Sequence, residues 1–264
     1  MMAIFQIEYR SDVLDMERCV NVILPDHSRL AKGEVLEDIP VLYLLHGMSG
    51  NQNSWLKRSA IERMTRYTNL AIVMPSTDMA WYTNTQYGMN YFNAITIELP
   101  AKIKEFFPQI TSSRDKTFIA GNSMGGYGAF KAAFLCDHYG YAASLSGALS
   151  FKGIDQESIA SEAYWRGIFG SPKEFEQCDD NLLIAAKKRI STKKPLPKLY
   201  AWCGLQDFVY EANTYAIYEL EHLGYDVCAS YEEGIHEWYD WANQIEHVLK
   251  WLPINYIEES IKNR

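Results

Sequence analysis

Short apolar, β-branched runs recur along the chain, and helical stretches separate them. In chain order they cover residues 5–10, 19–24, 41–46, 70–74, 117–121, 142–145, 198–204 and 226–231. Several runs are apolar at nearly every position, which is typical of strands covered on both faces. The alternation therefore predicts an α/β fold with a mostly parallel central sheet and helices on both faces.

Two parts of the chain depart from this alternation. Residues 5–10 and 19–24 are separated by only a few residues, which predicts an antiparallel hairpin at the sheet edge. Between about residues 150 and 197 the chain is polar and charged, with a helical stretch near 181–190. We interpret this segment as an insertion, either a cap that shapes a substrate pocket or a solvated crossover.

The length and the last helix complete the predicted architecture. A chain of 264 residues is expected to form one domain over residues 1–264, with the insertion at about 150–197. A helix is predicted over residues 238–251, and its apolar face should dock on the rest of the protein.

Composition excludes several classes of partner. Hydrophobic residues make up 48% and charged residues 22%, as in a soluble globular protein, and no apolar run approaches the ~18 residues of a membrane span. The formal charge is −8 and no basic cluster is longer than residues 187–189, so we expect no nucleic-acid partner.

The N-terminus and the cysteines suggest the compartment. The first residues show no pattern of a secretory signal, and the five cysteines form no C-x-x-C pair. We expect reduced cysteines packed as small hydrophobes, and a cytoplasmic protein.

A nucleophile elbow is predicted at Gly121-Asn122-Ser123-Met124-Gly125, which follows a predicted strand and leads into a helical stretch. Glycine is needed at 121 and 125 because a Cβ there would collide with the tight turn. The helix N-terminus places free N–H groups beside the serine. Ser123 is therefore the candidate nucleophile of a serine hydrolase. The alternative is an ordinary strand-to-helix turn; a phosphate-binding loop would need a lysine that is missing here.

A serine nucleophile needs a histidine base. His236 follows the last predicted strand, in a loop beyond the carboxyl edge of the sheet, where parallel sheets carry functional side chains. His46 lies upstream of the serine and is interpreted as bracing its loop by a hydrogen bond. No chemistry is assigned to the other histidines, at 27, 138, 222 and 247.

The histidine in turn needs an acid. Asp207 follows the predicted strand 198–204, which gives the chain order serine, aspartate, histidine that α/β-hydrolases use. Asp226 opens a strand at the opposite edge, and Asp240 falls on the predicted last helix, so both are less suitable.

Two backbone N–H groups must stabilise the oxyanion of the tetrahedral intermediate, each by about 3 kcal/mol. Met124 should supply one, and Met48, in the glycine-containing loop 46–50, the other. The sequence after His236 lacks the second histidine of an H-E-x-x-H site, so no metal is expected, and no cofactor is implied.

Aromatic residues gather near the predicted site. Trp81 and Gln86 belong to the aromatic loop 81–87, and Trp55 follows the oxyanion loop. These three residues are candidates for substrate binding. Aromatic packing or an oligomer interface is an equally valid interpretation of the aromatic residues.

With these residues assembled, the chain resembles the esterase D family of α/β-hydrolases, and most closely its bacterial tributyrin-esterase branch. The resemblance rests on residues 44–51 (LLHGMSGN), 121–128 (GNSMGGYG) and 234–238 (GIHEW). It implies a cofactor-free carboxylesterase that acts on small short-chain acyl esters, often as a homo-oligomer.

The same resemblance leaves other functions open. The family includes S-formylglutathione hydrolases and feruloyl esterases, and an acetyl esterase is a further alternative. Gly50 stands where the S-formylglutathione hydrolases usually carry a cysteine, which points away from the thioesterase. A catalytically silent scaffold that binds a ligand or a protein is the alternative from another class, but here every catalytic position is filled.

Overall fold

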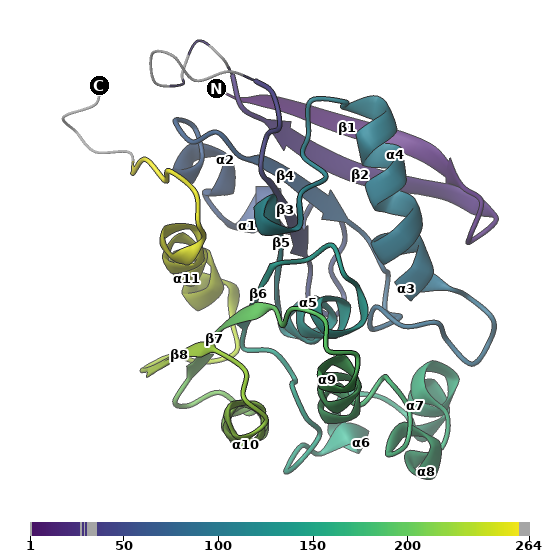
Figure 1. Cartoon of the computed structure of the whole chain (residues 1–264). Helices are drawn as coiled ribbons and strands as arrows, with labels where there is room; N and C mark the ends of the chain where they lie inside the picture. Colours follow the sequence, from purple (N-terminus) through teal and green to yellow (C-terminus); the bar gives the residue numbers. More distant parts are fainter. Residues whose placement is uncertain (1, 27, 29, 31–35, 259–264) are drawn as a thin grey trace.

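The computed structural model describes residues 2–26, 28, 30 and 36–258, so His27 lies outside the described residues. Eight strands in this part of the chain form one sheet in the order β1-β2-β4-β3-β5-β6-β7-β8 (Figure 1). Their bounds are β1 Ala3–Ser11, β2 Met16–Leu24, β3 Val41–Leu45, β4 Ala71–Pro75, β5 Thr117–Asn122, β6 Tyr141–Leu145, β7 Lys198–Gly204 and β8 Val227–Glu232.

The direction of the strands divides the sheet into two parts. Strands β1 and β2 form an antiparallel hairpin at one edge, and β2 also pairs antiparallel with β4. The remaining pairs, from β4 through β3 and β5 to β8, are all parallel. The predicted mixed edge and parallel centre are therefore confirmed. Parallel strands bring their carboxyl ends to one rim, and the loops there carry the candidate chemistry.

Helices connect the strands and cover the sheet (Figure 1). Before β6 they are α1 Ser54–Arg58, α2 Ile61–Met64, α3 Tyr91–Asn93, a π-helix Ala94–Glu98, α4 Leu99–Phe106, a 3-10 turn Arg114–Lys116 and α5 Met124–Leu135. After β6 they are α6 Gln156–Ile159, α7 Glu162–Phe169, α8 Pro172–Phe175, α9 Leu182–Ser191, α10 Tyr210–His222 and α11 Trp238–Trp251.

Alternate residues of the central strands serve two separate cores. On β3, Leu42 and Leu44 pack in a cluster with residues of α1, α2 and α11, whereas Tyr43 and Leu45 pack with α4, α5, α9 and α10. Figure 1 shows α11 on one side of the sheet and α5 and α9 on the other. The predicted helices on both faces are confirmed, and the last helix has the predicted bounds.

The segment between β6 and β7 contains four helices, of which the sequence predicted only one. That one is α9, whose first turn is capped by the Asn181 side chain. The other three are short: Asp155 caps α6, Ser161 caps α7, and Ser171 with Glu174 forms a capping box on α8. Local capping of this kind lets short helices form in a polar segment.

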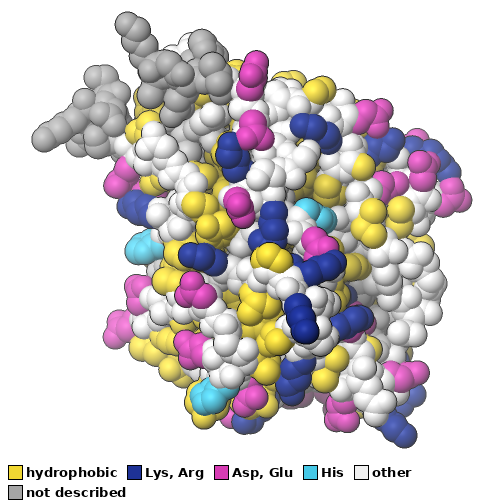
Figure 2. All heavy atoms as spheres, viewed as in Figure 1, with side chains coloured by type: hydrophobic (Ala, Val, Ile, Leu, Met, Phe, Trp, Pro, Cys, Tyr) yellow, Lys and Arg dark blue, Asp and Glu magenta, His cyan; other side chains and the backbone are white. Residues whose placement is uncertain are grey.

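Surface charges are mixed on the face seen in Figure 2. The basic run at residues 187–189 belongs to α9, and two of its three charges have acidic partners: Lys188 pairs with Asp179, and Arg189 with Asp137. The cysteines are free, but Cys19 and Cys228 are exposed rather than packed, because their strands lie at or next to the sheet edges. Within the described residues, no helix has the length and apolar character that crossing a membrane requires.

Candidate active site

Ser123 sits at the apex of a strained turn between β5 and α5. Its backbone angles, φ 54° and ψ −120°, lie in a region that residues with a Cβ rarely adopt. Two glycines make the turn possible. A Cβ on Gly121 would lie 2.5 Å from the carbonyl carbon of Gly125, and a Cβ on Gly125 would lie 2.6 Å from the carbonyl oxygen of Leu45. The steric reason that the sequence suggested for both glycines is present.

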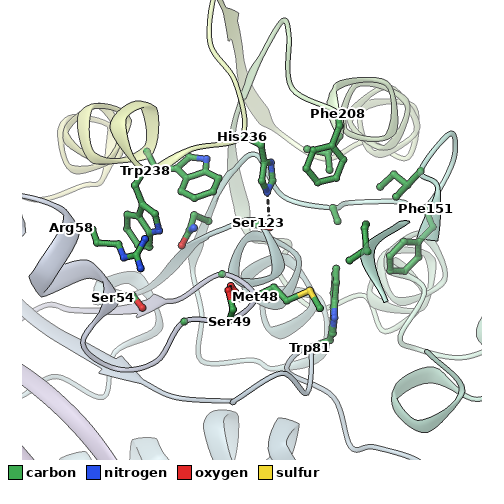
Figure 3. Close-up of a pocket in the computed structure, with 18 residues that line it drawn as sticks. Met48, Ser49, Ser54, Arg58, Trp81, Ser123, Phe151, Phe208, His236 and Trp238 are labelled. Atoms are coloured by element: carbon green, nitrogen blue, oxygen red, sulfur yellow. Dashed lines mark hydrogen bonds between the residues drawn. The ribbon is translucent and has the colours of Figure 1, made fainter. Parts of the chain in front are cut away.

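Three side chains from separate loops form a hydrogen-bonded row at the rim of the sheet. Figure 3 shows the contact between two of them, Ser123 and His236. Ser123 Oγ lies 2.9 Å from His236 Nε2. His236 Nδ1 lies 2.9 and 3.0 Å from the two carboxylate oxygens of Asp207. In this arrangement Nδ1–H donates to the carboxylate, so Nε2 is free to accept the serine proton. The structure thus brings the predicted nucleophile, base and acid together.

The Asp207 carboxylate is fully buried, and the backbone N–H of Val209 donates to it at 3.0 Å. The two rival aspartates lie elsewhere. Asp226 is exposed, 3.9 Å from Lys198, and Asp240 accepts a hydrogen bond from the backbone N–H of Ile235 at 2.8 Å. Asp240 therefore holds the histidine loop, and only Asp207 of these three contacts the His236 ring.

The loops that carry Asp207 and His236 are joined to each other directly. The side-chain Oε1 of Gln206 accepts a hydrogen bond from the Gly234 backbone N–H at 2.9 Å. The backbone N–H of Gln206 donates to the Gly234 carbonyl at 3.1 Å. A Cβ on Gly204 would lie 2.2 Å from that carbonyl oxygen, so only glycine permits the approach. The separation of acid and base is therefore set by backbone contacts.

The oxyanion loop lies directly against the elbow. A Cβ on Gly47 would be 2.8 Å from Asn122 Nδ2 and 3.4 Å from Ser123 Cβ. Met48 follows Gly47 and lines the same cavity as Ser123. Met124 is the first residue of α5, where the helical pattern leaves the backbone N–H without an intrahelical acceptor. Both predicted oxyanion donors therefore belong to backbone that borders Ser123.

His46 braces this loop, as the sequence suggested. Its Nδ1–H donates to the Gly47 carbonyl at 2.7 Å, and Nε2 accepts from the Thr77 N–H at 3.1 Å. The Tyr82 hydroxyl donates to the His46 carbonyl at 2.9 Å. Both ring nitrogens are used in the neutral form, and burial lowers the pKa of His46 to about 4.

This lowered pKa predicts a loss of stability in acid. The unfolded chain takes up a proton near pH 6.5, whereas folded His46 takes it up only near pH 4. The stabilisation from neutral His46 is therefore complete above pH 6.5. Below that pH the free energy of unfolding decreases, by about 3 kcal/mol at pH 4.

A His46→Gln variant keeps an acceptor for the Thr77 N–H but cannot be protonated. Urea unfolding at pH 7.0, 5.5 and 4.0 should show a smaller decrease in unfolding free energy for the variant than for the wild type. Parallel pH curves would contradict this explanation.

Of the three candidate substrate-binding residues, one lines the cavity and two lie outside it. Trp81 is buried and lines the cavity, and its Nε1–H donates to the Tyr164 hydroxyl at 3.0 Å. Trp55 does not line it; the indole is buried and donates to the Leu45 carbonyl at 2.9 Å, which holds the end of β3. Gln86 is exposed outside the cavity, and its backbone N–H bonds to the Gly167 carbonyl at 2.9 Å.

The cavity at Ser123 has a volume of about 250 Å³ and two chemically different arms (Figure 3). The polar arm contains Ser54, Arg58 and Trp238, and the Arg58 guanidinium lies 5.6 Å from the centre of the Trp238 ring. The aromatic arm contains Trp81, Phe151 and Phe208.

Sequence reasoning missed most of these residues. Phe208 and Trp238 could have been found, because one is adjacent to Asp207 and the other lies two residues after His236. Arg58 and Phe151 carry no such signal.

No group of three or more His, Cys, Asp or Glu side chains that could hold a metal ion occurs in the described part of the chain. The arrangement at Ser123 is instead suited to nucleophilic attack on a carbonyl carbon, because nucleophile, base, acid and amide donors border one cavity.

Comparisons with known proteins agree with this chemistry. The acetyl esterase of Caldicellulosiruptor saccharolyticus is 31% identical over 262 residues, which cover 95% of this chain and 98% of the relative. Among solved structures, substrate-bound FphF, a fluorophosphonate-binding serine hydrolase of Staphylococcus aureus, is similar with a TM-score of 0.86 and 29% identity, covering 95% of this chain and 98% of its own.

A second solved structure is nearly as similar. The S-formylglutathione hydrolase FrmB from Staphylococcus aureus has a TM-score of 0.84 and 28% identity, over 96% of this chain and 99% of its own. The model of the Esterase family matches residues 11–252. The chain therefore belongs to the Esterase family, as a serine carboxylic ester hydrolase with the α/β-hydrolase fold.

Proposed function

We propose that this protein hydrolyses esters of short-chain carboxylic acids through an acyl-enzyme on Ser123. The observation that carries the proposal is the hydrogen-bonded row Asp207–His236–Ser123, in which Oδ1 to Nδ1 and Nε2 to Oγ are each 2.9 Å. Ser123 and His236 line the cavity of about 250 Å³. A cavity of this size favours a small acyl group. The similarity to an acetyl esterase supports the same choice.

In the first half of the reaction Ser123 Oγ attacks the ester carbonyl carbon while His236 Nε2 takes the hydroxyl proton. Negative charge on the former carbonyl oxygen is stabilised by the Met48 and Met124 N–H groups. Collapse of the intermediate breaks the bond to the alcohol oxygen, and His236 returns its proton to that oxygen. The products of this half are the free alcohol and an ester of Ser123.

In the second half His236 takes a proton from water, whose oxygen attacks the acyl carbon. The bond to Ser123 Oγ breaks, Oγ recovers the proton from His236, and the carboxylic acid leaves. Asp207, which is buried and hydrogen-bonded, stabilises the imidazolium in both halves. The acyl group is assigned to the aromatic arm, where apolar burial is favourable, and the alcohol to the polar arm.

We also propose that the protein belongs to the esterase D family and its tributyrin-esterase branch, and that it forms a homo-oligomer. We further propose a cytoplasmic location and a single domain with an insertion at about 150–197. Size-exclusion chromatography with light scattering addresses the subunit count directly.

Two measurements test the proposed function. A fluorophosphonate probe followed by peptide mass analysis should label Ser123, because the probe reacts with an activated serine hydroxyl. Hydrolysis of p-nitrophenyl acetate, butyrate and octanoate should then be fastest for the shorter chains. Labelling of another residue, or no labelling, would count against the proposal.

A thioesterase is the second candidate function, and the position of the Arg58 guanidinium in the cavity favours it. Within the described residues, no ion pair joins this guanidinium to a carboxylate, and it lines the polar arm where the leaving group is assigned. A leaving group with carboxylates, such as that of an S-formylglutathione thioester, would meet a cation there. The likeness to the hydrolase FrmB points the same way.

An Arg58→Gln variant should therefore lose selectivity for anionic leaving groups. We expect the ratio of kcat/KM for 4-acetoxybenzoate to that for its methyl ester to fall about two- to fivefold, the effect of an exposed charge pair. Raising the salt concentration should reduce the wild-type ratio in the same direction. Lys57→Gln is the matched control, because it makes the same charge change one residue away from the cavity lining. Equal changes in both variants would contradict a local role for Arg58.

A further inference from the structure

A second cavity, of about 580 Å³, adjoins the cavity at Ser123. Its walls come largely from the segment between β6 and β7, and they include Trp165 and Phe169 of α7, Phe175 of α8, and Leu182 and Leu183 of α9. Ala148 and Phe151 line both cavities. The two spaces are thus neighbours that share a wall.

Phe151 is the bulky part of that shared wall. Its ring centre lies 5.6 Å from that of Trp81, which lines the first cavity. It also lies 5.7 Å from Trp165, 5.6 Å from Phe169 and 5.3 Å from Phe175, which line the second. The other shared residue is an alanine, so the Phe151 ring supplies most of the side-chain bulk between the two spaces.

The second cavity has the character of an apolar-chain site. Trp165, Phe169 and Leu182 in its wall are buried. The charged residues around it are exposed, and two of them, Glu162 and Arg166, pair with each other at 2.8 Å. An apolar chain that lies against these buried side chains would gain from leaving water.

We propose that Phe151 sets the acyl-chain limit of this enzyme, and that the second cavity is an acyl-chain site that this ring closes off. The inference rests on the proposed ester hydrolysis at Ser123 and on the assignment of the acyl group to the aromatic arm. In the wild type, chains longer than the aromatic arm meet the Phe151 ring. Removing the ring joins the two spaces into one continuous apolar channel.

A Phe151→Ala variant tests this directly. The kcat/KM for p-nitrophenyl octanoate relative to that for p-nitrophenyl acetate should rise about tenfold or more, since each methylene that finds an apolar site has a large effect on discrimination. Phe151→Leu should show a smaller rise in the same direction, and it covers the case in which the alanine variant fails to fold. An unchanged ratio in a folded Phe151→Leu variant would overturn the proposal.

A second substitution shows where the longer chain goes. Leu183→Trp, added to Phe151→Ala, fills the second cavity and should remove the gain with octanoate. Leu183→Ala is the matched control: it shortens a side chain that lines only the second cavity and keeps the rings that pack against Phe151, so the octanoate-to-acetate ratio should stay at the wild-type value. If the double variant keeps the full rise in the octanoate-to-acetate ratio, or if the control variant shows the same rise, the acyl chain does not reach the second cavity past Phe151.

Failure of this inference and failure of the proposed function can be told apart. Normal turnover of p-nitrophenyl acetate with an unchanged chain-length profile in the Phe151 variants would overturn the inference alone. No turnover of any ester by the wild type would overturn the proposed function. A crystal structure of Phe151→Ala after reaction with an octylphosphonate ester should show the alkyl chain in the second cavity. A chain lying in the polar arm would overturn the inference.

Discussion

A Ser123→Ala variant is expected to lose about 10⁶-fold in kcat for p-nitrophenyl acetate while folding normally. The substitution removes the hydroxyl that lies 2.9 Å from His236 Nε2 and leaves the Cβ in place. The turn keeps its shape because Gly121 and Gly125 are untouched. Without the hydroxyl no acyl-enzyme forms, and only the oxyanion donors and substrate binding still accelerate attack by water.

The purified variant is tested for a burst phase of p-nitrophenol release and for labelling by the fluorophosphonate probe. We expect it to show neither. Ser191→Ala makes the same change at the exposed end of α9 and should retain full turnover and labelling. Substantial hydrolysis by Ser123→Ala would mean that another nucleophile or a directly activated water performs the reaction.

An Asp207→Asn variant is expected to lose about 10⁴-fold in kcat. The amide oxygen would keep the hydrogen bond from the Val209 N–H, which places the NH₂ group opposite His236 Nδ1. This arrangement favours the imidazole tautomer with its proton on Nε2. That nitrogen then points a proton at Ser123 Oγ and cannot accept one.

Asp226→Asn is the control for this experiment, because Asp226 is exposed and its carboxylate lies 3.9 Å from Lys198 Nζ. It should leave kcat unchanged within about twofold, as for a substitution at an exposed surface site. A large effect at Asp226 together with a small one at Asp207 would reverse the assignment of the acid.

The elbow could be read from the sequence because its chemistry is local. Five consecutive residues, Gly121 to Gly125, specify the tight turn, and the flanking strand and helix are apolar enough to be recognised. Asp207 and His236 were found by a different route: parallel strands bring their carboxyl ends to one rim, so residues just after two strands become neighbours without any sequence proximity.

The cavity-lining residues on α1 could not be predicted because the sequence does not show the direction in which their side chains point. Trp55 follows the oxyanion loop in sequence, but its indole turns inward to donate to Leu45, because a buried N–H needs an acceptor. Arg58 lies one turn later and reaches the cavity instead. Composition cannot distinguish these two outcomes, since both residues are on the same short helix.

The short helices α6 to α8 were missed for another reason. Helices α6 and α8 have only four residues each, too few for a hydrophobic period to emerge. Helix α7 has eight residues, and its buried Trp165, Ile168 and Phe169 were a helical signal that the sequence interpretation did not use. For α8 the available signal was the Ser171-x-x-Glu174 pattern, which forms a capping box with Pro172 in the first turn. Phe151, in the loop before α6, could not be given a role until these helices had been located.

The left-handed backbone at Ser123 has an evolutionary consequence. Glycine would occupy this conformation without the ~1–3 kcal/mol of strain that a side chain adds there. Selection for heat tolerance alone would therefore favour replacing the very residue that reacts. Stability and turnover therefore favour different residues at this position, because glycine would relieve the strain whereas only serine supplies the hydroxyl beside His236.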